Sequence, residues 1–170
     1  MKKIITLLLF CGFAIIIYSQ EDRNGITPVT LDAITVSPLN VDYLRKVNDG
    51  QTPEVVEELQ YRAANFDVSR LSEYDKKAIK TFEVVFKATN GDVIAYYTAD
   101  GSIVTAFEKF ENIVLPLTVR RMVFDGYEGW RMQKNRYVCV FSENNLTKKQ
   151  YKVTLTDGQH KKRMTLNFDE

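Results

Sequence analysis

Histidine and cysteine are scarce in this sequence, which holds one His, His160, and two Cys, Cys11 and Cys139. Common zinc sites take about four ligands, mostly Cys and His, so this chain alone does not assemble one. A Ser-His-Asp triad would depend on His160, which lies on a charged segment beside a turn with no nucleophile elbow. The glycines stand singly, and those beyond the apolar N-terminal stretch lie at turns, so no glycine-rich loop is present to cradle a phosphate. The sequence therefore predicts a non-enzymatic protein without a metal or cofactor.

The chain also lacks an excess of charge of one sign, because 23 Lys and Arg residues face 22 Asp and Glu residues. This balance argues against a nucleic-acid-binding protein. The charges are unevenly placed, with acidic residues frequent over 21–75 and basic residues frequent in the last third. A basic patch would attract an acidic partner or an anionic lipid surface, whereas alternation with apolar residues is typical of the solvated face of a sheet. The basic residues of the last third include Arg131, Lys134, Arg136, Lys148, Lys149, Lys152, Lys161, Lys162 and Arg163.

Long hydrophobic runs are absent except at the N-terminus, where Lys2 and Lys3 precede an apolar stretch over 4–17 and the small residue Ser19 follows it. This order is typical of a cleaved secretory signal, which we place at residues 1–20. The apolar stretch is shorter than the roughly 20 residues of a membrane span. An uncleaved N-terminal anchor is the alternative. We expect a periplasmic or secreted protein that meets the membrane only through its signal peptide.

Lipid attachment at Cys11 would require small residues ahead of it, where Leu9 and Phe10 stand instead. Cleavage of the signal would leave Cys139 without a partner for an internal disulfide. Because Cys139 lies in the apolar segment 137–141, we expect a buried strand and a thiol that acts as a small inert hydrophobe. A catalytic thiol would need a basic neighbour that the local sequence does not supply.

Residues 21–50 are predicted to form an N-terminal leader, with an edge strand at 31–36 where apolar and β-branched residues alternate. A helix is predicted to follow, with Thr52 as N-cap and Pro53 in its first turn, and to end near Asn65. The apolar residues on its predicted buried side are Val55, Val56, Leu59 and Ala63.

Alternation of apolar and polar residues predicts three antiparallel strands at 81–88, 93–98 and 103–110. Asn90-Gly91 and Asp100-Gly101 separate them, and such pairs favour tight hairpins because both turn positions tolerate positive φ.

A second helix is predicted from Leu115-Pro116 to the glycines Gly126 and Gly129, with Val119, Met122 and Val123 facing inward. A second set of three strands follows at 130–141, 151–156 and 164–168, with Asp157-Gly158 at the last hairpin.

The two halves share one pattern, a proline-started helix followed by three strands with Asp-Gly before the last. We interpret residues 51–112 and 113–170 as an internal duplication. The predicted fold class is α+β, in which an antiparallel sheet carries two helices on one face and is built from tandem helix-plus-three-strand repeats.

The helix opened by Leu115-Pro116, the segment Gly126-Tyr127-Glu128-Gly129-Trp130 and the strands with an Asp-Gly hairpin resemble the PepSY-like families. These include the β-lactamase-inhibitor-like periplasmic proteins, which are built from tandem helix-plus-sheet units. The resemblance covers residues 50–170. It implies a non-enzymatic exported module that binds or inhibits another protein, often a peptidase or cell-wall enzyme. No residue with an inhibitory role in those families carries over, so the target stays open.

Aromatic residues are the strongest functional signal beyond the fold. Adjacent Tyr96 and Tyr97 must point to opposite sides of their strand, so one of them lies on the face away from the helices. A sheet face with Tyr, Trp and Arg side chains is typical of protein interfaces. The candidate protein-binding surface comprises Tyr97, Tyr127, Trp130, Arg131 and Arg136.

Two alternatives to a protein-binding module in the cell envelope remain at this point. One is an envelope-associated binder of lipid or glycan that uses the basic C-terminal hairpins, for which binding would depend strongly on salt. The other is an enzyme with paired carboxylates, which we expect instead to be polar residues facing outward from their strands. The carboxylates concerned are Glu83, Asp92, Glu108 and Glu111.

Overall fold

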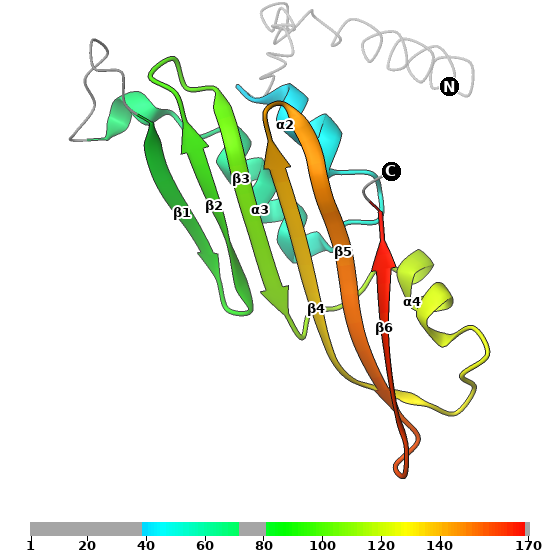
Figure 1. Ribbon diagram of the computed structural model, residues 1–170. Helices are drawn as coiled ribbons and strands as arrows, with labels where there is room; N and C mark the ends of the chain where they lie inside the picture. Colours follow the sequence, from blue (N-terminus) through cyan, green and yellow to red (C-terminus); the bar gives the residue numbers. More distant parts are fainter. Residues whose placement is uncertain (1–38, 72–80, 169–170) are drawn as a thin grey trace, which may run out of the picture. The chain divides into compact units, whose positions relative to one another are not determined.

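The computed structural model describes residues 39–71 and 81–168, which form an α+β fold with a six-stranded antiparallel sheet (Figure 1). The predicted signal peptide at 1–20 and the predicted edge strand at 31–36 lie outside the described residues. The described helices are α2 (Val41–Val47), α3 (Glu54–Ala64) and α4 (Leu117–Phe124), with a 3-10 turn η2 (Val68–Arg70). The strands are β1 (Phe82–Ala88), β2 (Gly91–Tyr97), β3 (Ile103–Glu111), β4 (Arg131–Ser142), β5 (Asn145–Thr156) and β6 (Lys161–Asn167).

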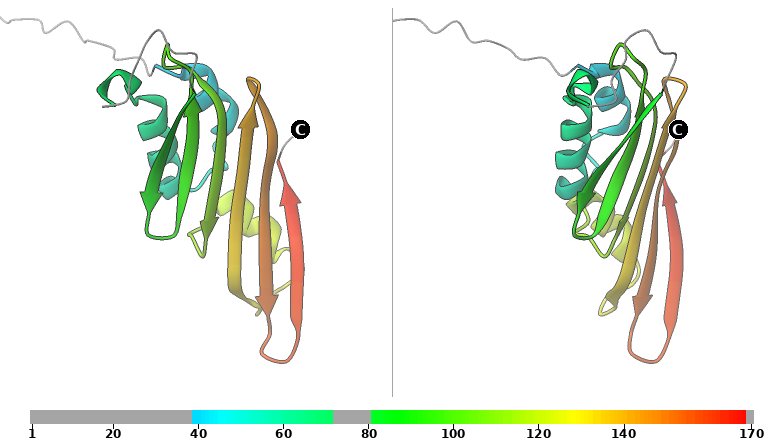
Figure 2. Two further views of the ribbon diagram at one scale, coloured as in Figure 1. Left: turned by 60° about the vertical axis from the view of Figure 1, so that its left-hand side comes forward. Right: turned by 90° about the vertical axis from the view of Figure 1, so that its left-hand side faces the viewer.

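The strands pair in chain order from β1 to β6, and each neighbour is antiparallel (Figure 2). The predicted α+β class with an antiparallel sheet is confirmed. Strand β5 begins at Asn145 rather than at the predicted residue 151, because Glu143 and Asn144 form a two-residue turn that pairs Ser142 with Asn145. Both turn residues have positive φ, 51° and 64°, which suits the twist of a hairpin.

The hairpin between β1 and β2 differs from the prediction. Ala88 pairs with Gly91, so Thr89 and Asn90 make the turn and Gly91 is the first residue of β2. Gly91 is required for close approach to β3, since a Cβ there would lie 2.6 Å from Phe110 ring carbons and against the Lys109 carbonyl. At the next hairpin Gly101 has φ +86°, as the Asp-Gly turn predicts.

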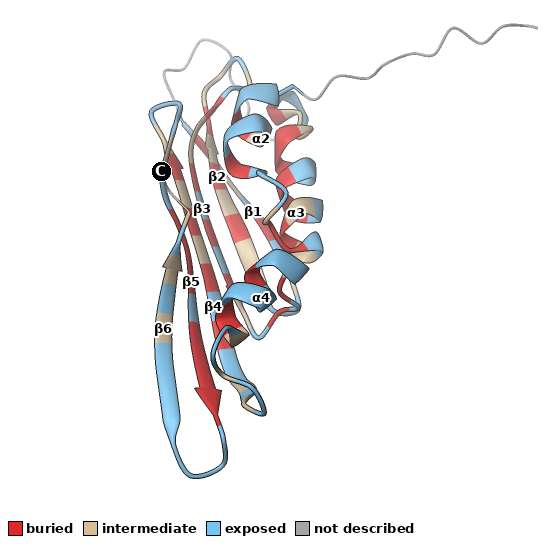
Figure 3. Ribbon diagram, turned by 90° about the vertical axis from the view of Figure 1, so that its right-hand side faces the viewer, coloured by how far each residue is buried: buried red, intermediate tan, exposed pale blue. Residues whose placement is uncertain are grey.

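The helices lie on the same side of the sheet in Figure 3. Helix α3 packs against β1, β2 and β3, while α2 packs against α3, β4 and β5. The sequence did not predict α2, although Tyr43 and Val47 stand four residues apart and both are buried. Asp42 in its first turn and the basic pair Arg45 and Lys46 in its last turn complement the helix dipole.

Helix α3 begins one residue later than predicted. Pro53 is its N-cap and makes no side-chain cap, while the Thr52 hydroxyl donates to the Val47 carbonyl oxygen at 3.2 Å. In α4, Val119 and Val123 are buried as predicted, but Met122 is exposed. An eight-residue helix buries only the line through Val119 and Val123, which leaves Met122 beside it in solvent.

The predicted alternation is followed in β4, whereas β5 buries Thr154 and Thr156 on its other face as well. Tyr137, Cys139 and Phe141 are buried, and so are Tyr151 and Val153. In β6, at the edge of the sheet, and just after it, three apolar residues are half-buried and pack against the core. They are Met164, Leu166 and Phe168.

We expect Gly91→Ala to lower the free energy of unfolding by about 2 kcal/mol, because the added methyl group overpacks the β2–β3 contact. Urea denaturation followed by circular dichroism measures the change. Thr89→Ala, at an exposed position of the same hairpin, is the matched control and should change stability little. Equal stability of the Gly91 variant and this control would contradict the close approach.

Candidate functional site

A row of four paired residues, three of them with ionisable side chains, crosses the buried side of the sheet. Val93, Glu108, Cys139 and Lys149 pair directly with one another across β2, β3, β4 and β5. Directly paired residues project to the same face of a sheet. Glu108 is 1% exposed, so the expectation that it faces outward is wrong. Its neighbours at alternate positions, Ala106 and Phe110, are buried and set the direction of its side chain.

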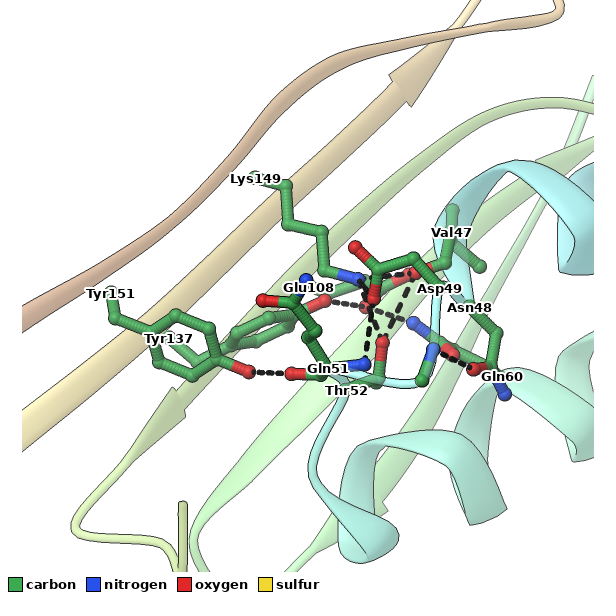
Figure 4. Close-up of polar contacts among 11 residues, drawn as sticks. Val47, Asn48, Asp49, Gln51, Thr52, Gln60, Glu108, Tyr137, Lys149 and Tyr151 are labelled. Carbon is green, nitrogen blue, oxygen red and sulfur yellow. Dashed lines mark hydrogen bonds and ion pairs between the residues drawn. The ribbon is translucent and has the colours of Figure 1, made fainter. Parts of the chain in front are cut away.

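The Glu108 carboxylate accepts hydrogen bonds from three elements, and Figure 4 shows two of the donors, Gln60 and Tyr137. The Tyr43 hydroxyl of α2 and the Gln60 amide of α3 each donate at 2.8 Å, and the Tyr137 hydroxyl of β4 donates at 3.4 Å. Burial raises the pKa of Glu108, while these hydrogen bonds act in the opposite direction. Burial and the neighbouring Glu108 charge also raise the pKa values of Tyr43 and Tyr137.

Lys149 binds the connector between α2 and α3 from the other end of this row. Its side chain is 0% exposed, so the expectation that this lysine belongs to a solvated face is wrong. Its ammonium group donates to the Val47 carbonyl and the Thr52 hydroxyl at 2.8 Å and pairs with Asp49 at 2.6 Å (Figure 4). All three donors of the ammonium group are therefore used.

Cys139 lies between Glu108 and Lys149, and its predicted burial is confirmed. The sequence supplied no basic neighbour within the strand, but the fold brings Lys149 directly opposite it. Burial is the main cause that raises the pKa of the Cys139 thiol. Because the lysine is committed to the connector and the thiol is held neutral, the pair is not arranged as an activated nucleophile.

Glu108 and Lys149 together fasten the helical layer to the sheet. Their partners belong to α2, to the connector and to α3, and the Tyr151 hydroxyl adds a 2.5 Å hydrogen bond to the Gln51 carbonyl. Glu108, Lys149 and their partners Tyr43, Thr52, Gln60 and Tyr137 are buried, whereas Asp49 is exposed at the edge of this group. We define the buried residues of this group as the buried polar cluster: Tyr43, Thr52, Gln60, Glu108, Tyr137 and Lys149.

The predicted binding surface is divided by the fold. Tyr97 is buried, and its hydroxyl donates to the Ala63 carbonyl of α3 at 2.8 Å, so it does not belong to an exposed surface. It pairs with the buried Phe82, which places it on the helix side of β2. The neighbouring Tyr96 points the other way, where its hydroxyl donates to Glu83 at 2.6 Å.

Tyr127 and Trp130 lie in the connection between α4 and β4, where their rings meet edge to face at 5.4 Å. Lys162 lies 5.9 Å from the Tyr127 ring centroid and pairs with the buried Leu155. This pairing places the contact on the helix side of the sheet. The two aromatic residues therefore do not join Arg131 and Arg136, whose register positions lie on the opposite side.

The helix-free face carries an apolar row that the sequence analysis missed. Val85, Ile94, Phe107 and Val140 pair in register across β1, β2, β3 and β4. Val85 is 40% exposed and Phe107 is 45% exposed, and Tyr96 meets the Phe107 ring edge to face at 6.2 Å. In the sequence these residues stand among polar neighbours, and only the register brings them together.

A basic cluster occupies the same face over β4, β5 and β6. We define it by six residues: Arg131, Lys134, Arg136, Lys152, Lys161 and Arg163. All six are exposed. Of these, Arg136 forms an ion pair with Glu111 at 2.8 Å. Two of the predicted surface residues, Arg131 and Arg136, thus lie together on this face.

His160 is exposed at the β5–β6 hairpin, as predicted, with its Nδ1 atom 3.0 Å from the Asp157 carboxylate. Within residues 39–71 and 81–168, no group of three or more His, Cys, Asp or Glu side chains is arranged to hold a metal ion. The same residues include no helix that is both long and apolar enough to cross a membrane. Comparison with protein-family models, curated proteins and solved structures finds no match to this chain.

Replacing Lys149 tests the link between the sheet and the connector. We expect Lys149→Met to lower the free energy of unfolding by about 2 kcal/mol, because it removes the three hydrogen bonds of the buried ammonium group to Val47, Asp49 and Thr52. Lys148→Met, at an exposed position next in the chain, is the matched control. Denaturant titration measures both variants, and equal stability of the two would contradict the role of Lys149.

The pH dependence of stability tests Glu108. Because its folded-state pKa is raised, its contribution is complete below the unfolded pKa of roughly 4.3 and is lost as pH rises through the folded value. We expect the stability of the wild type relative to Glu108→Gln to decrease as pH rises above about 4.3. Urea titrations across pH measure this difference, with Glu58→Gln on α3 as the exposed control. A difference that grows with pH would contradict the prediction.

Proposed function

We propose that this chain is a non-enzymatic exported module that binds a protein partner of the cell envelope on the helix-free face of its sheet. The observation that carries the proposal is the apolar row, in which Val85, Ile94, Phe107 and Val140 are adjacent on four strands. Single exposed apolar residues are ordinary, but a contiguous patch is typical of an interaction site. Export is supported by the signal-like pattern of residues 1–20.

The surroundings of the apolar row support a protein as the partner. Phe107 and Tyr96 supply aromatic surface, and polar or charged residues such as Glu83 and Lys109 border the row. Protein interfaces commonly combine an apolar centre, rich in aromatic residues, with a polar rim. A sheet surface of this composition offers a broad contact area rather than a deep pocket, and inhibition of an enzyme such as a peptidase is one use of such a surface.

We further propose that the module is PepSY-like and arose by internal duplication, with a helix and three strands in each half. The element order supports this, since α3 precedes β1 to β3 and α4 precedes β4 to β6. Pro53 and Pro116 are the N-caps of these two helices. Gly101 and Gly158, which follow Asp before the last strand of each half, have φ of +86° and +103°.

Binding of an envelope lipid or glycan is the second candidate function. The basic cluster favours it, because anionic headgroups and acidic sugars would be attracted to adjacent Lys and Arg side chains. Such binding would weaken strongly as salt is added.

Replacing Phe107 tests the proposed function. We expect Phe107→Thr to reduce capture of the partner from envelope extract at least tenfold, because it removes the aromatic centre of the apolar row. Threonine is well accommodated in strands, so the sheet should be retained. Quantitative affinity capture with mass spectrometry measures the loss for each captured protein.

Met122→Gln on α4 is the matched control, since it removes an exposed apolar side chain on the helix side. A protein whose capture depends on Phe107 and not on Met122 supports the proposal. Equal capture of every protein by the wild type and both variants would remove the helix-free face as the binding surface.

A further inference from the structure

The basic cluster forms an ordered grid on three adjacent strands. Arg131, Thr156 and Lys161 pair across β4, β5 and β6, and so do Lys134, Thr154 and Arg163. Arg136, Lys152 and Thr165 form the third row. Alternate residues along a strand lie roughly 6.6 to 6.8 Å apart, and neighbouring strands lie roughly 4.8 Å apart.

These cations have few counter-charges on their own face. Among the described residues, the ion pair of Arg136 with Glu111 is the one formed by any member of the cluster. Like charges directly opposite on adjacent strands repel one another, as Arg136 and Lys152 do, and a bound anion would relieve this repulsion. The buried Thr154 and Thr156 lie between the cations, as expected where long basic side chains extend over a strand.

From this geometry we propose that the basic cluster binds an extended acidic segment of the protein partner, with Asp or Glu at every second position. The inference rests on the proposed function and adds the chemistry of the partner. An extended segment places alternate side chains on one face at the same spacing as Lys134 and Arg136 on β4, or Lys161 and Arg163 on β6. The three arginines offer planar donors that match carboxylates in paired hydrogen bonds.

Other polyanions fit the cluster less well. Single-stranded nucleic acid is held by aromatic stacking beside the basic residues, and the three rows of the grid contain no aromatic side chain. Interfacial membrane binding combines basic residues with apolar side chains that enter the bilayer, whereas the apolar row lies over β1 to β4, toward the other edge of the sheet. An acidic protein segment needs neither feature. Electrostatic attraction would then speed association, while the apolar row would hold the bound partner.

The test uses the full chain and a fluorescent peptide with blocked termini and five Glu-Thr repeats. We expect saturable binding by fluorescence anisotropy that weakens at least tenfold in the Lys134→Glu/Arg163→Glu variant, which reverses the two cations on either side of Thr154 in the middle row of the grid. The control is Lys46→Glu/Arg62→Glu, which makes the same change in net charge on exposed positions of α2 and α3 and should bind as the wild type does. The Lys134→Gln/Arg163→Gln variant gives the same direction without charge reversal if the first variant fails to fold.

Two further probes separate the outcomes. A peptide with five Thr followed by five Glu should bind more weakly than the alternating peptide, and equal binding would overturn the proposed spacing. Vesicles containing about one third anionic phospholipid should bind less than the peptide, and binding of vesicles in place of the peptide would overturn the acidic segment as the ligand. Equal loss of binding in the grid variant and its control would show that the peptide responds to the net charge of the protein and not to the basic cluster, which would overturn the proposal.

The Glu-Thr peptide has no large apolar side chain to contact the apolar row. Phe107→Thr should therefore leave peptide binding unchanged. Loss of partner capture in Phe107→Thr, together with no peptide binding by the wild type, would overturn the acidic ligand while leaving the proposed function in place. Peptide binding by the wild type, together with partner capture that does not depend on Phe107, would overturn the proposed function while leaving the acidic ligand in place.

Discussion

The constraint on which this fold depends is the burial of Glu108 and Lys149 on one face of the sheet. A buried carboxylate or ammonium group is strongly destabilising unless hydrogen bonds or opposite charges satisfy it. Glu108 finds its partners in Tyr43 of α2, Gln60 of α3 and Tyr137 of β4. Lys149 finds its partners in the connector between the two helices. The two side chains therefore fix where the helices lie, which hydrophobic packing alone specifies less closely.

Fixing the helices on one face determines what the other face presents. Residues that alternate with the core in each strand face away from the helices, and register collects them into the apolar row and the basic cluster. The row is made of residues distant in sequence, such as Val85 and Val140. The same pairing rule therefore builds both the enclosed polar cluster and the proposed binding surface. A protein partner that meets an apolar centre and a basic flank on one sheet fits this arrangement.

The sequence predicted the elements better than the faces. Turn residues and twofold alternation located the strands, and a proline start located α3 and α4. The face that each residue occupies was harder to predict. Between Ala106 and Phe110, apolar residues stand at positions that face both sides of the sheet, and a carboxylate stands on the buried side. Lys149 resembles its exposed neighbour Lys148 in sequence, and only the connector that reaches it in the fold makes it a core residue. The prediction that Tyr97 lies on the exposed surface was wrong for the same reason. The sequence pattern did not show which of Tyr96 and Tyr97 faces away from the helices.

Thiol labelling of the native protein tests most directly whether one face is enclosed and the other open. In a chain with Cys11→Ser and Val85→Cys, two thiols report on the two faces of the sheet. The thiol at position 85 lies on the helix-free face, and Cys139 lies on the helix side between Glu108 and Lys149. We predict that the thiol at position 85 reacts at the rate of an exposed cysteine, whereas Cys139 reacts only after unfolding. Equal protection of both thiols would show that the proposed binding face is covered. Equally fast reaction of both thiols would show that the helices do not enclose the opposite face.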